Sequence, residues 1–214
     1  MRSELEEFGG IDDGTEPTGI ETGTTIVAVA GSEGAVLAAD RRASLGGRLV
    51  TNRSVRKIEP VAERAALAFS GTVGGAQAFL RGLRAHRRRY EQRHGEASVE
   101  TIATVAGRLI AEGGFGVGLL LAGVDRDESG PTPAVYEIDP AGGVLATEYA
   151  ASGSGTQLAY GALEGSVDTG GTPEAIEETA IGAVRAASER DAVSGDGVTV
   201  ARLSGAGVSI EEVA

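Results

Sequence analysis

The sequence of 214 residues contains no cysteine, only one lysine and only two histidines. Without cysteine the chain can form neither a disulfide nor a thiolate nucleophile, and it has no cysteine-based metal site. The two histidines, His86 and His94, fall in an arginine-rich segment, residues 81–93, where we expect a solvated helix surface. A Ser-His-Asp triad is therefore hard to build, and any acyl-transfer chemistry must take its base from another group.

Long apolar runs are also lacking. The longest, residues 117–124, is too short to cross a bilayer, and the amino-terminal residues lack the basic and apolar regions of a signal peptide. The chain has 19 basic and 31 acidic residues, a net charge of -12. Such acidity argues against general nucleic-acid binding and is typical of a cytosolic protein or of a salt-adapted proteome. We therefore expect a cytoplasmic protein with neither nucleic-acid nor membrane partners.

The single lysine, Lys57, is unusual because the other 18 basic residues are arginines. A coding bias toward arginine would leave an exposed lysine by chance. A lysine ammonium, however, has a pKa that burial can tune, whereas a guanidinium keeps its charge. Lys57 is therefore a candidate for a chemical role.

The character of the chain changes at Thr24. Residues 1–23 are rich in Gly, Glu, Asp and Thr and cannot bury enough apolar surface to order themselves well. The apolar runs 26–30 and 35–40 flank a Gly-Ser-Glu-Gly turn, which predicts a β-hairpin. If the turn is centred between Ser32 and Glu33, the residue numbers of two cross-strand partners sum to 65. Thr25 then faces Asp40, and Thr24 lies beside Asp40. Thr24 is either an ordinary first strand residue or the new amino terminus of a processed chain.

The rest of the sequence alternates between groups of strands and pairs of helices. Thr72, Ser98 and Thr172 are predicted amino-terminal helix caps, and Pro173 suits a first helical position. Strands that are apolar on both faces need cover on both sides. We therefore expect an α+β fold, a four-layer αββα sandwich of two stacked antiparallel sheets with a helix pair outside each. Strands are predicted at 26–30, 35–40, 49–50, 54–58 (ended by Pro60), 65–70, 116–124, 134–138, 144–149, 198–203 and 208–210, and helices at 73–94, 99–110, 157–163 and 173–190.

Six short motifs occur in the order found in catalytic β subunits of the proteasome, and together they resemble the archaeal or actinobacterial form. The resemblance spans Thr24 to the carboxyl terminus. The motifs are Gly23-Thr24-Thr25, Asp40-Arg41-Arg42-Ala43-Ser44, Arg56-Lys57, Ser70-Gly71-Thr72, Gly153-Ser154-Gly155 and Arg190-Asp191-Ala192-Val193-Ser194-Gly195.

This resemblance implies the N-terminal-nucleophile hydrolase fold and a precursor that cuts itself between Gly23 and Thr24. Residues 1–23 would be the propeptide and residues 24–214 the threonine peptidase domain. A free α-amine has a reference pKa of about 7.7 to 8.0 and can accept the proton of a hydroxyl, whereas an amide nitrogen cannot. The resemblance makes Thr24 the nucleophile, Lys57 the ammonium that stabilises its alkoxide, and Asp40 the carboxylate that orients Lys57.

The same resemblance assigns the backbone N–H of Gly71 as the oxyanion donor and places Ser154, Asp191 and Ser194 around the amine. Each residue also has a simpler structural explanation, and that of Gly71 is an ordinary turn before a helix. Asp40 could pair with Arg42, Ser154 could cap the third helix, and Asp191 and Ser194 could shape a turn.

The first specificity site is assigned by the resemblance to Ala43, Val55, Phe69 and Val73. All four are apolar, which predicts cleavage after hydrophobic residues, with Phe69 making the pocket shallow. Two departures from the family pattern occur. Ile26 replaces a common third threonine, and the segment between Arg42 and Lys57 is one residue longer.

Family resemblance further implies heptameric β rings sealed between rings of proteasome α subunits, an ATP-dependent unfoldase and unfolded protein substrates, with neither metal nor organic cofactor. Three alternatives stay open at this point. They are the bacterial heat-shock threonine peptidase that pairs with a hexameric ATPase, a non-catalytic ring-building β subunit, and nucleic-acid binding through residues 81–93.

Overall fold

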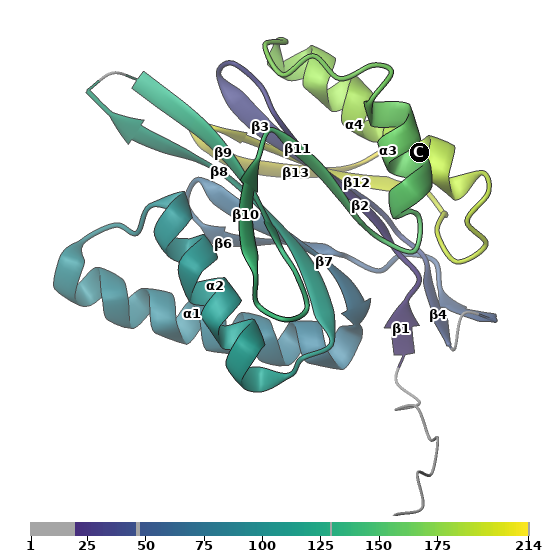
Figure 1. Ribbon diagram of the computed structural model, residues 1–214, viewed down its shortest axis with the longest axis horizontal. Helices are drawn as coiled ribbons and strands as arrows, with labels where there is room; N and C mark the ends of the chain where they lie inside the picture. The colour runs from purple at the N-terminus through teal and green to yellow at the C-terminus, as the bar shows by residue number, and fades with distance from the viewer. Residues whose placement is uncertain (1–19, 46–47, 129, 214) are drawn as a thin grey trace, which may run out of the picture.

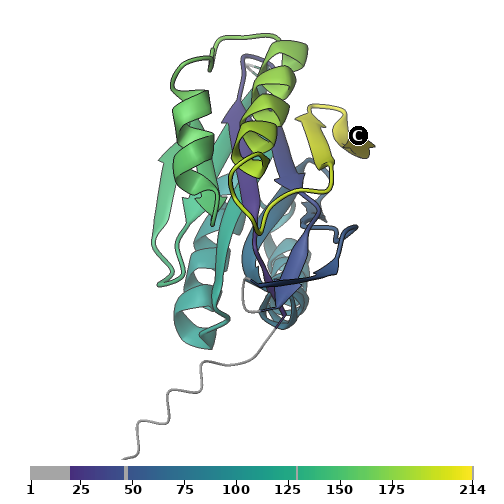
Figure 2. The ribbon, with the colours of Figure 1, turned by 90° about the vertical axis from the view of Figure 1, so that its right-hand side faces the viewer.

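The computed structural model describes residues 20–45, 48–128 and 130–213. These residues form four layers, with two stacked sheets between two pairs of helices (Figure 1). One outer layer holds α1 (Val73–His94) and α2 (Val99–Gly113), and the opposite layer holds α3 (Thr156–Leu163) and α4 (Pro173–Ser188). The helices α3 and α4 lie side by side over the smaller sheet (Figure 2). The predicted αββα sandwich is therefore confirmed.

Both sheets are antiparallel. The smaller sheet has the strand order β11-β2-β3-β12-β13, and the larger one has the order β10-β9-β8-β7-β1-β4-β5, with β6 also paired to β7. Their bounds are β1 Ile20–Thr22, β2 Thr25–Ala30, β3 Gly34–Asp40, β4 Ala43–Leu45, β5 Leu49–Asn52, β6 Ile58–Ala62, β7 Ala65–Thr72, β8 Val117–Asp127, β9 Gly130–Ile138, β10 Val144–Thr147, β11 Tyr149–Gly153, β12 Val198–Ser204 and β13 Gly207–Val213.

Successive side chains of the central strands point to opposite faces of the sheet, and this divides the apolar side chains among three buried clusters. In β2, Ile26 and Ala28 face the cluster between the two sheets, whereas Val27 and Val29 face the cluster under α3 and α4. A third cluster, which includes Phe79, fills the space between the larger sheet and α1 and α2. A continuous apolar run such as 26–29 is thus buried on both faces because each sheet has one neighbouring layer on each side.

The register of the first hairpin agrees with the sequence prediction. Ile26 pairs with Ala39 and Val27 pairs with Ala38, so partner numbers sum to 65. The predicted caps are also observed, since the hydroxyl of Thr72 accepts a hydrogen bond from Gly75 N at 3.2 Å and begins α1. The hairpin therefore delivers Thr25 and Asp40 to the same end of the smaller sheet.

Several strand predictions are wrong. Lys57 does not belong to a strand, and β6 begins after it and contains Pro60 rather than ending there. Proline is tolerated because β6 pairs only with β7 and the register of that pairing shifts directly after Pro60. No strand was predicted between residues 41 and 48, where β4 lies. Tyr149, predicted as the last residue of the strand 144–149, instead begins β11, and residues 150–153 of β11 were not predicted as strand.

The end of the leader is ordered, contrary to the prediction for residues 1–23. Residues 20–22 form β1, which lies between β7 and β4. Thr22 pairs with Gly71 on one side, and Glu21 pairs with Thr72 and with Ser44. The composition of the leader predicts weak order only when the segment is considered alone, and here two neighbouring strands supply its hydrogen-bond partners. Residues 1–19 lie outside the described residues.

Candidate active site

The amino end of β2 brings the candidate nucleophile next to a buried ion pair. Thr24, Asp40 and Lys57 are each 0% exposed. Lys57 Nζ donates to Asp40 Oδ1 at 2.7 Å and to the carbonyl oxygen of Gly23 at 2.8 Å. The only lysine in the chain therefore contacts the peptide bond that joins the leader to Thr24.

Asp40 is held by four donors. Its Oδ1 accepts from Lys57 Nζ and from Thr25 N at 2.9 Å, and its Oδ2 accepts from Arg42 N at 3.1 Å and Gly195 N at 2.9 Å. With both oxygens occupied, the carboxylate has one orientation, and that orientation points at Lys57.

The simpler pairing of Asp40 with the Arg42 guanidinium is not observed. That guanidinium instead donates to Asp196 Oδ2 at 2.8 Å and to the carbonyl oxygen of Ala192 at 2.8 Å. The Arg42 side chain thereby connects the end of β3 to the loop that follows α4. The Asp40 carboxylate pairs with the Lys57 ammonium instead.

Burial acts on the two members of the ion pair in opposite directions. Loss of hydration raises the pKa of Asp40, and the charge of Lys57 opposes this rise. Loss of hydration lowers the pKa of Lys57, and the charge of Asp40 opposes that fall. Burial thus moves the pKa of Asp40 up and that of Lys57 down, while the 2.7 Å hydrogen bond between them opposes both shifts.

A second group of polar residues lies on the nitrogen side of Thr24. Thr24 N donates to Ser154 Oγ at 3.1 Å, and Ser154 Oγ donates to Asp191 Oδ2 at 2.6 Å. Ser194 Oγ donates to the same carboxylate oxygen at 2.6 Å. The structure therefore brings together all three residues that the sequence assigned to the surroundings of this nitrogen.

Their simpler structural explanations hold only in part. The cap of α3 is Gly155 and forms no side-chain capping bond, so Ser154 does not cap that helix. Asp191 does shape its own turn, because Val193 N donates to its Oδ1 at 3.2 Å. The other carboxylate oxygen of Asp191 remains directed at the two serines.

Gly71 lies at the end of β7, directly before the cap of α1. Its φ of +105° belongs to the left-handed region, and a Cβ there would fall 2.3 Å from the carbonyl oxygen of Gly116. Only glycine fits both conditions. Because Gly71 pairs with Thr22, it lies beside the strand that leads into Gly23. Its role as oxyanion donor stays a prediction.

Three of the four predicted specificity residues lie on elements that neighbour β1, and the fourth, Val55, donates its backbone N–H to the carbonyl oxygen of Arg41. Ala43 is in β4 and Phe69 in β7, and both are buried. Val55, in the loop before β6, and Val73, the first residue of α1, are half-buried. Phe69 belongs to the core under α1 and α2, so its ring could form only the floor of a site. Their joint role as a pocket stays a prediction.

Sequence reasoning missed the side chain of Thr25. Its Oγ1 lies 2.9 Å from Ser194 Oγ, and the residue is 0% exposed. The hairpin register placed Thr25 opposite Asp40, so the backbone contact could be predicted, but nothing in the spacing predicted a partner on the distant loop after α4.

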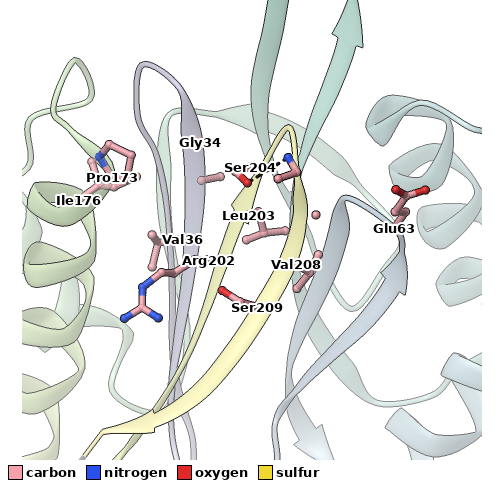
Figure 3. Close-up of a pocket in the computed structure, with 13 residues that line it drawn as sticks. Gly34, Val36, Glu63, Pro173, Ile176, Arg202, Leu203, Ser204, Val208 and Ser209 are labelled. Atoms are coloured by element: carbon pink, nitrogen blue, oxygen red, sulfur yellow. Dashed lines mark hydrogen bonds between the residues drawn. The ribbon is translucent and has the colours of Figure 1, made fainter.

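A groove of about 590 Å³ lies elsewhere, between the β12–β13 hairpin and the start of α4 (Figure 3). It is lined by residues such as Gly34, Arg202 and Val208, and by none of the predicted site residues. Gly34 and Asp40 are the two ends of β3, and seven strand residues span about 20 Å. The groove is therefore remote from Thr24.

Within the described ranges, no helix is long and apolar enough to span a membrane. The same residues contain no group of three or more His, Cys, Asp or Glu side chains placed to hold a metal ion.

A sequence profile described as "Proteasome subunit" matches residues 20–203. The chain is 46% identical over 203 residues to the proteasome subunit beta of Halorhabdus utahensis, covering 94% of this chain and 85% of that relative. It is 44% identical over 212 residues to the proteasome subunit beta 2 of Haloterrigena turkmenica, covering 96% and 88%. It is 48% identical over 193 residues to the proteasome subunit beta of Halomicrobium mukohataei, covering 89% and 79%.

Proposed function

Because this chain belongs to the proteasome family as a β subunit, we propose that it is a catalytic one, a threonine endopeptidase whose nucleophile is the hydroxyl of Thr24. We also propose that it is made as a precursor, which cuts itself between Gly23 and Thr24. Residues 1–23 are then a propeptide, and residues 24–214 are the working domain.

One observation carries this proposal, namely the contact of buried Lys57 with the Gly23 carbonyl at 2.8 Å. A buried ion pair contributes little net stability, because desolvation of both charges offsets their attraction. A subunit that only builds rings would gain nothing from placing such a pair against the bond before Thr24. A peptidase gains a polarised carbonyl and a tunable ammonium there.

Self-cleavage requires the Thr24 hydroxyl oxygen to attack the carbonyl carbon of Gly23. The hydroxyl proton passes to the amide nitrogen as the carbon–nitrogen bond breaks, which leaves an ester and a free amine. Water then hydrolyses the ester to release Gly23 as a carboxylate and restore the Thr24 hydroxyl. Lys57 donates a hydrogen bond to the Gly23 oxygen as negative charge develops on it.

In the mature enzyme the freed α-amine is the general base for the Thr24 hydroxyl. The contacts of Ser154 with this nitrogen and of Asp191 with Ser154 support a role for both residues in orienting the amine. The Thr24 oxygen attacks the substrate carbonyl carbon, with the N–H of Gly71 as oxyanion donor, and the peptide carbon–nitrogen bond then breaks. The proton held by the Thr24 amine passes to the departing nitrogen, so the carboxyl-side fragment leaves as an amine, and water hydrolyses the acyl-enzyme ester that remains on Thr24.

The leader indicates how a substrate lies in the site. Strand β1 pairs with β7 on one side and with β4 on the other, and we propose that an unfolded polypeptide takes the same extended path. Its residue before the cut then reaches the apolar site formed by Ala43, Val55, Phe69 and Val73, so cleavage follows hydrophobic residues. Fluorogenic peptides test this preference, and a tenfold preference for a small residue before the cut would count against it.

Intact-mass and amino-terminal analysis of the expressed protein tests the main proposal. The wild type should lose residues 1–23 and begin at Thr24, whereas Thr24→Ala should persist as the full precursor. Lys57→Arg, which keeps the charge but not the compact ammonium, should also persist uncleaved. Equal trimming of wild type and Thr24→Ala would show that another protease makes the cut.

We further propose that the subunit works in heptameric β rings between rings of proteasome α subunits, in the cytoplasm, where an ATP-dependent unfoldase supplies unfolded chains. A promiscuous peptidase must be enclosed to spare folded proteins. Native mass spectrometry of the subunit assembled with its α partner measures the number of subunits in a ring. Six rather than seven would favour the heat-shock peptidase architecture.

A further inference from the structure

Thr25, the residue after the proposed nucleophile, contacts both groups of polar residues that flank the site. Its backbone N donates to Asp40 Oδ1, the same oxygen that accepts from Lys57. Its side-chain Oγ1 lies 2.9 Å from Ser194 Oγ. One fully buried residue therefore connects the ion pair on one side of Thr24 with the serines on the other.

The direction of the side-chain hydrogen bond follows from the donors available. An ionised carboxylate only accepts, so the Ser194 hydroxyl uses its single proton to reach Asp191 Oδ2 at 2.6 Å. The Thr25 hydroxyl must then donate to the Ser194 oxygen. The result is a directed chain of two hydroxyls that ends on the Asp191 carboxylate.

The packing leaves the Thr25 hydroxyl little freedom. A Cβ on Gly155 would fall 2.0 Å from Thr25 Oγ1, so a side chain at position 155 would displace the hydroxyl. Gly155 also begins α3 and directly follows Ser154. The turn that carries Ser154 to the Thr24 nitrogen is therefore also the turn that makes room for the Thr25 hydroxyl.

We propose that Thr25 is a positioning residue for the amine base, through a hydroxyl that fixes Ser194 and thereby the Asp191 carboxylate. This inference rests on the proposed peptidase function. Donation into the Asp191 carboxylate disperses its negative charge. Without the Thr25 hydroxyl, Asp191 attracts the protonated Thr24 amine more strongly, and the amine loses its proton only at higher pH.

Three charged side chains act electrostatically on Lys57, which contacts the carbonyl oxygen of Gly23 next to Thr24. Asp191 comes from the loop after α4, Asp40 and Arg42 from the end of β3 and the residues after it, and Lys57 from the loop before β6. Replacing the Thr25 side chain leaves its backbone N–H, and hence the bond to Asp40, in place. The loss of the hydroxyl therefore acts on the amine through Asp191.

The test compares Thr25→Val, which keeps the branched shape but not the hydroxyl, with Thr25→Ser, which keeps the hydroxyl. Thr199→Val is the matched control, since Thr199 is a buried strand threonine outside this hydrogen-bond chain. Peptide hydrolysis by the assembled enzyme is measured from about pH 6 to 9, around the reference pKa of an amine. Rates are expressed per active site, counted by titration with a covalent inhibitor of Thr24.

We expect Thr25→Val to lower kcat about threefold to tenfold, as for the loss of one hydrogen bond in a catalytic network, with KM changed less than about twofold. The acid limb of its pH profile should move up by about 0.3 to 0.5 pH units, because the ammonium form is better stabilised. Thr25→Ser should restore both the rate and the profile, and Thr199→Val should match the wild type.

A double-mutant cycle with Ser194→Ala locates the effect. If Thr25 acts through Ser194, adding Thr25→Val to Ser194→Ala should produce no further shift of the acid limb. Thr25→Ala, which has no branched side chain to misfit, replaces Thr25→Val if the latter does not fold.

An acid limb that stays in place in Thr25→Val, or a serine variant that behaves like the valine variant, overturns the inference, because the defect would then be one of packing. Additive shifts in the cycle overturn it as well. Failure of the proposed function is distinct, since the wild type would then show no Thr24-dependent hydrolysis at all.

Discussion

Replacing Asp40 by asparagine should destabilise the precursor severely, because Lys57 would remain buried without its counter-charge. Both side chains are 0% exposed and joined at 2.7 Å. Removing one partner of a buried ion pair costs about 3 to 5 kcal/mol. The asparagine amide adds to this cost, since its NH2 group would face donors where a carboxylate oxygen now accepts.

The measurement is denaturant unfolding at fixed protein concentration, in a Thr24→Ala background that keeps every variant as an uncleaved chain. Glu212→Gln is the control, because it breaks the Arg41–Glu212 ion pair at 2.9 Å, in which Glu212 is 63% exposed. Surface pairs of this kind contribute about 0 to 1 kcal/mol. The midpoint should therefore fall far more for Asp40→Asn than for the control.

A third variant separates charge from packing. Asp40→Asn combined with Lys57→Met removes the buried ammonium and should recover part of the lost stability, because no uncompensated charge remains. If Asp40→Asn costs no more than Glu212→Gln, or if the double variant is less stable than the single one, the ion pair does not govern stability at this site.

Three further predictions concern the fold around the site. Ser98→Ala removes the cap of α2, in which Ser98 Oγ accepts a hydrogen bond from Thr101 N, and should lower the free energy of unfolding by about 1 kcal/mol in thermal or denaturant unfolding. Its control is Thr104→Ala, at an exposed position in the middle of the same helix, which should not lower stability. Gly71→Ala should lower stability by at least about 1 to 3 kcal/mol for the strained backbone alone, whereas Gly74→Ala, which meets no atom within 4 Å, should be tolerated. Hydrogen bonds from arginine lower the pKa of Asp196 below the ordinary 3.8, so its stabilising effect is full above pH 3.8 and is lost as the pH falls through the lower folded-state value; Asp196→Asn should therefore lose less stability on acidification than the wild type.

The parts of the fold that the sequence predicted are those set by local chemistry. A short turn with glycine at each end fixes the register of a hairpin, and this is why Thr25 and Asp40 were placed together correctly. Thr72, Ser98 and Thr172 are helix caps whose signal is complete within four residues. The alternation of strand groups with helix pairs along the sequence, and strands that are apolar on both faces, were enough to predict two sheets covered by helices.

The parts that failed depend on partners distant in the chain. Residues 20–22 form a strand only because β7 and β4 flank them, and Pro60 is tolerated only because β6 has a single neighbour. The 2.9 Å contact of Thr25 with Ser194 joins residues 169 positions apart. No periodicity within either segment carries information about such a contact.

The proposed cut also changes the larger sheet, because β1 belongs to the segment that is removed. On its edge opposite β8, β7 is paired with β6 along Ala65–Ala68 and with β1 at Gly71 and Thr72. While the leader is attached, β1 is held at a high effective concentration by its covalent link to β2. Cleavage between Gly23 and Thr24 ends that link, so the short strand can dissociate and expose the edges of β7 and β4. In this proposal, the bond whose rupture frees the amine of Thr24 is also the bond that keeps β1 between β7 and β4, so that one cleavage would both create the base and open the sheet to another extended chain.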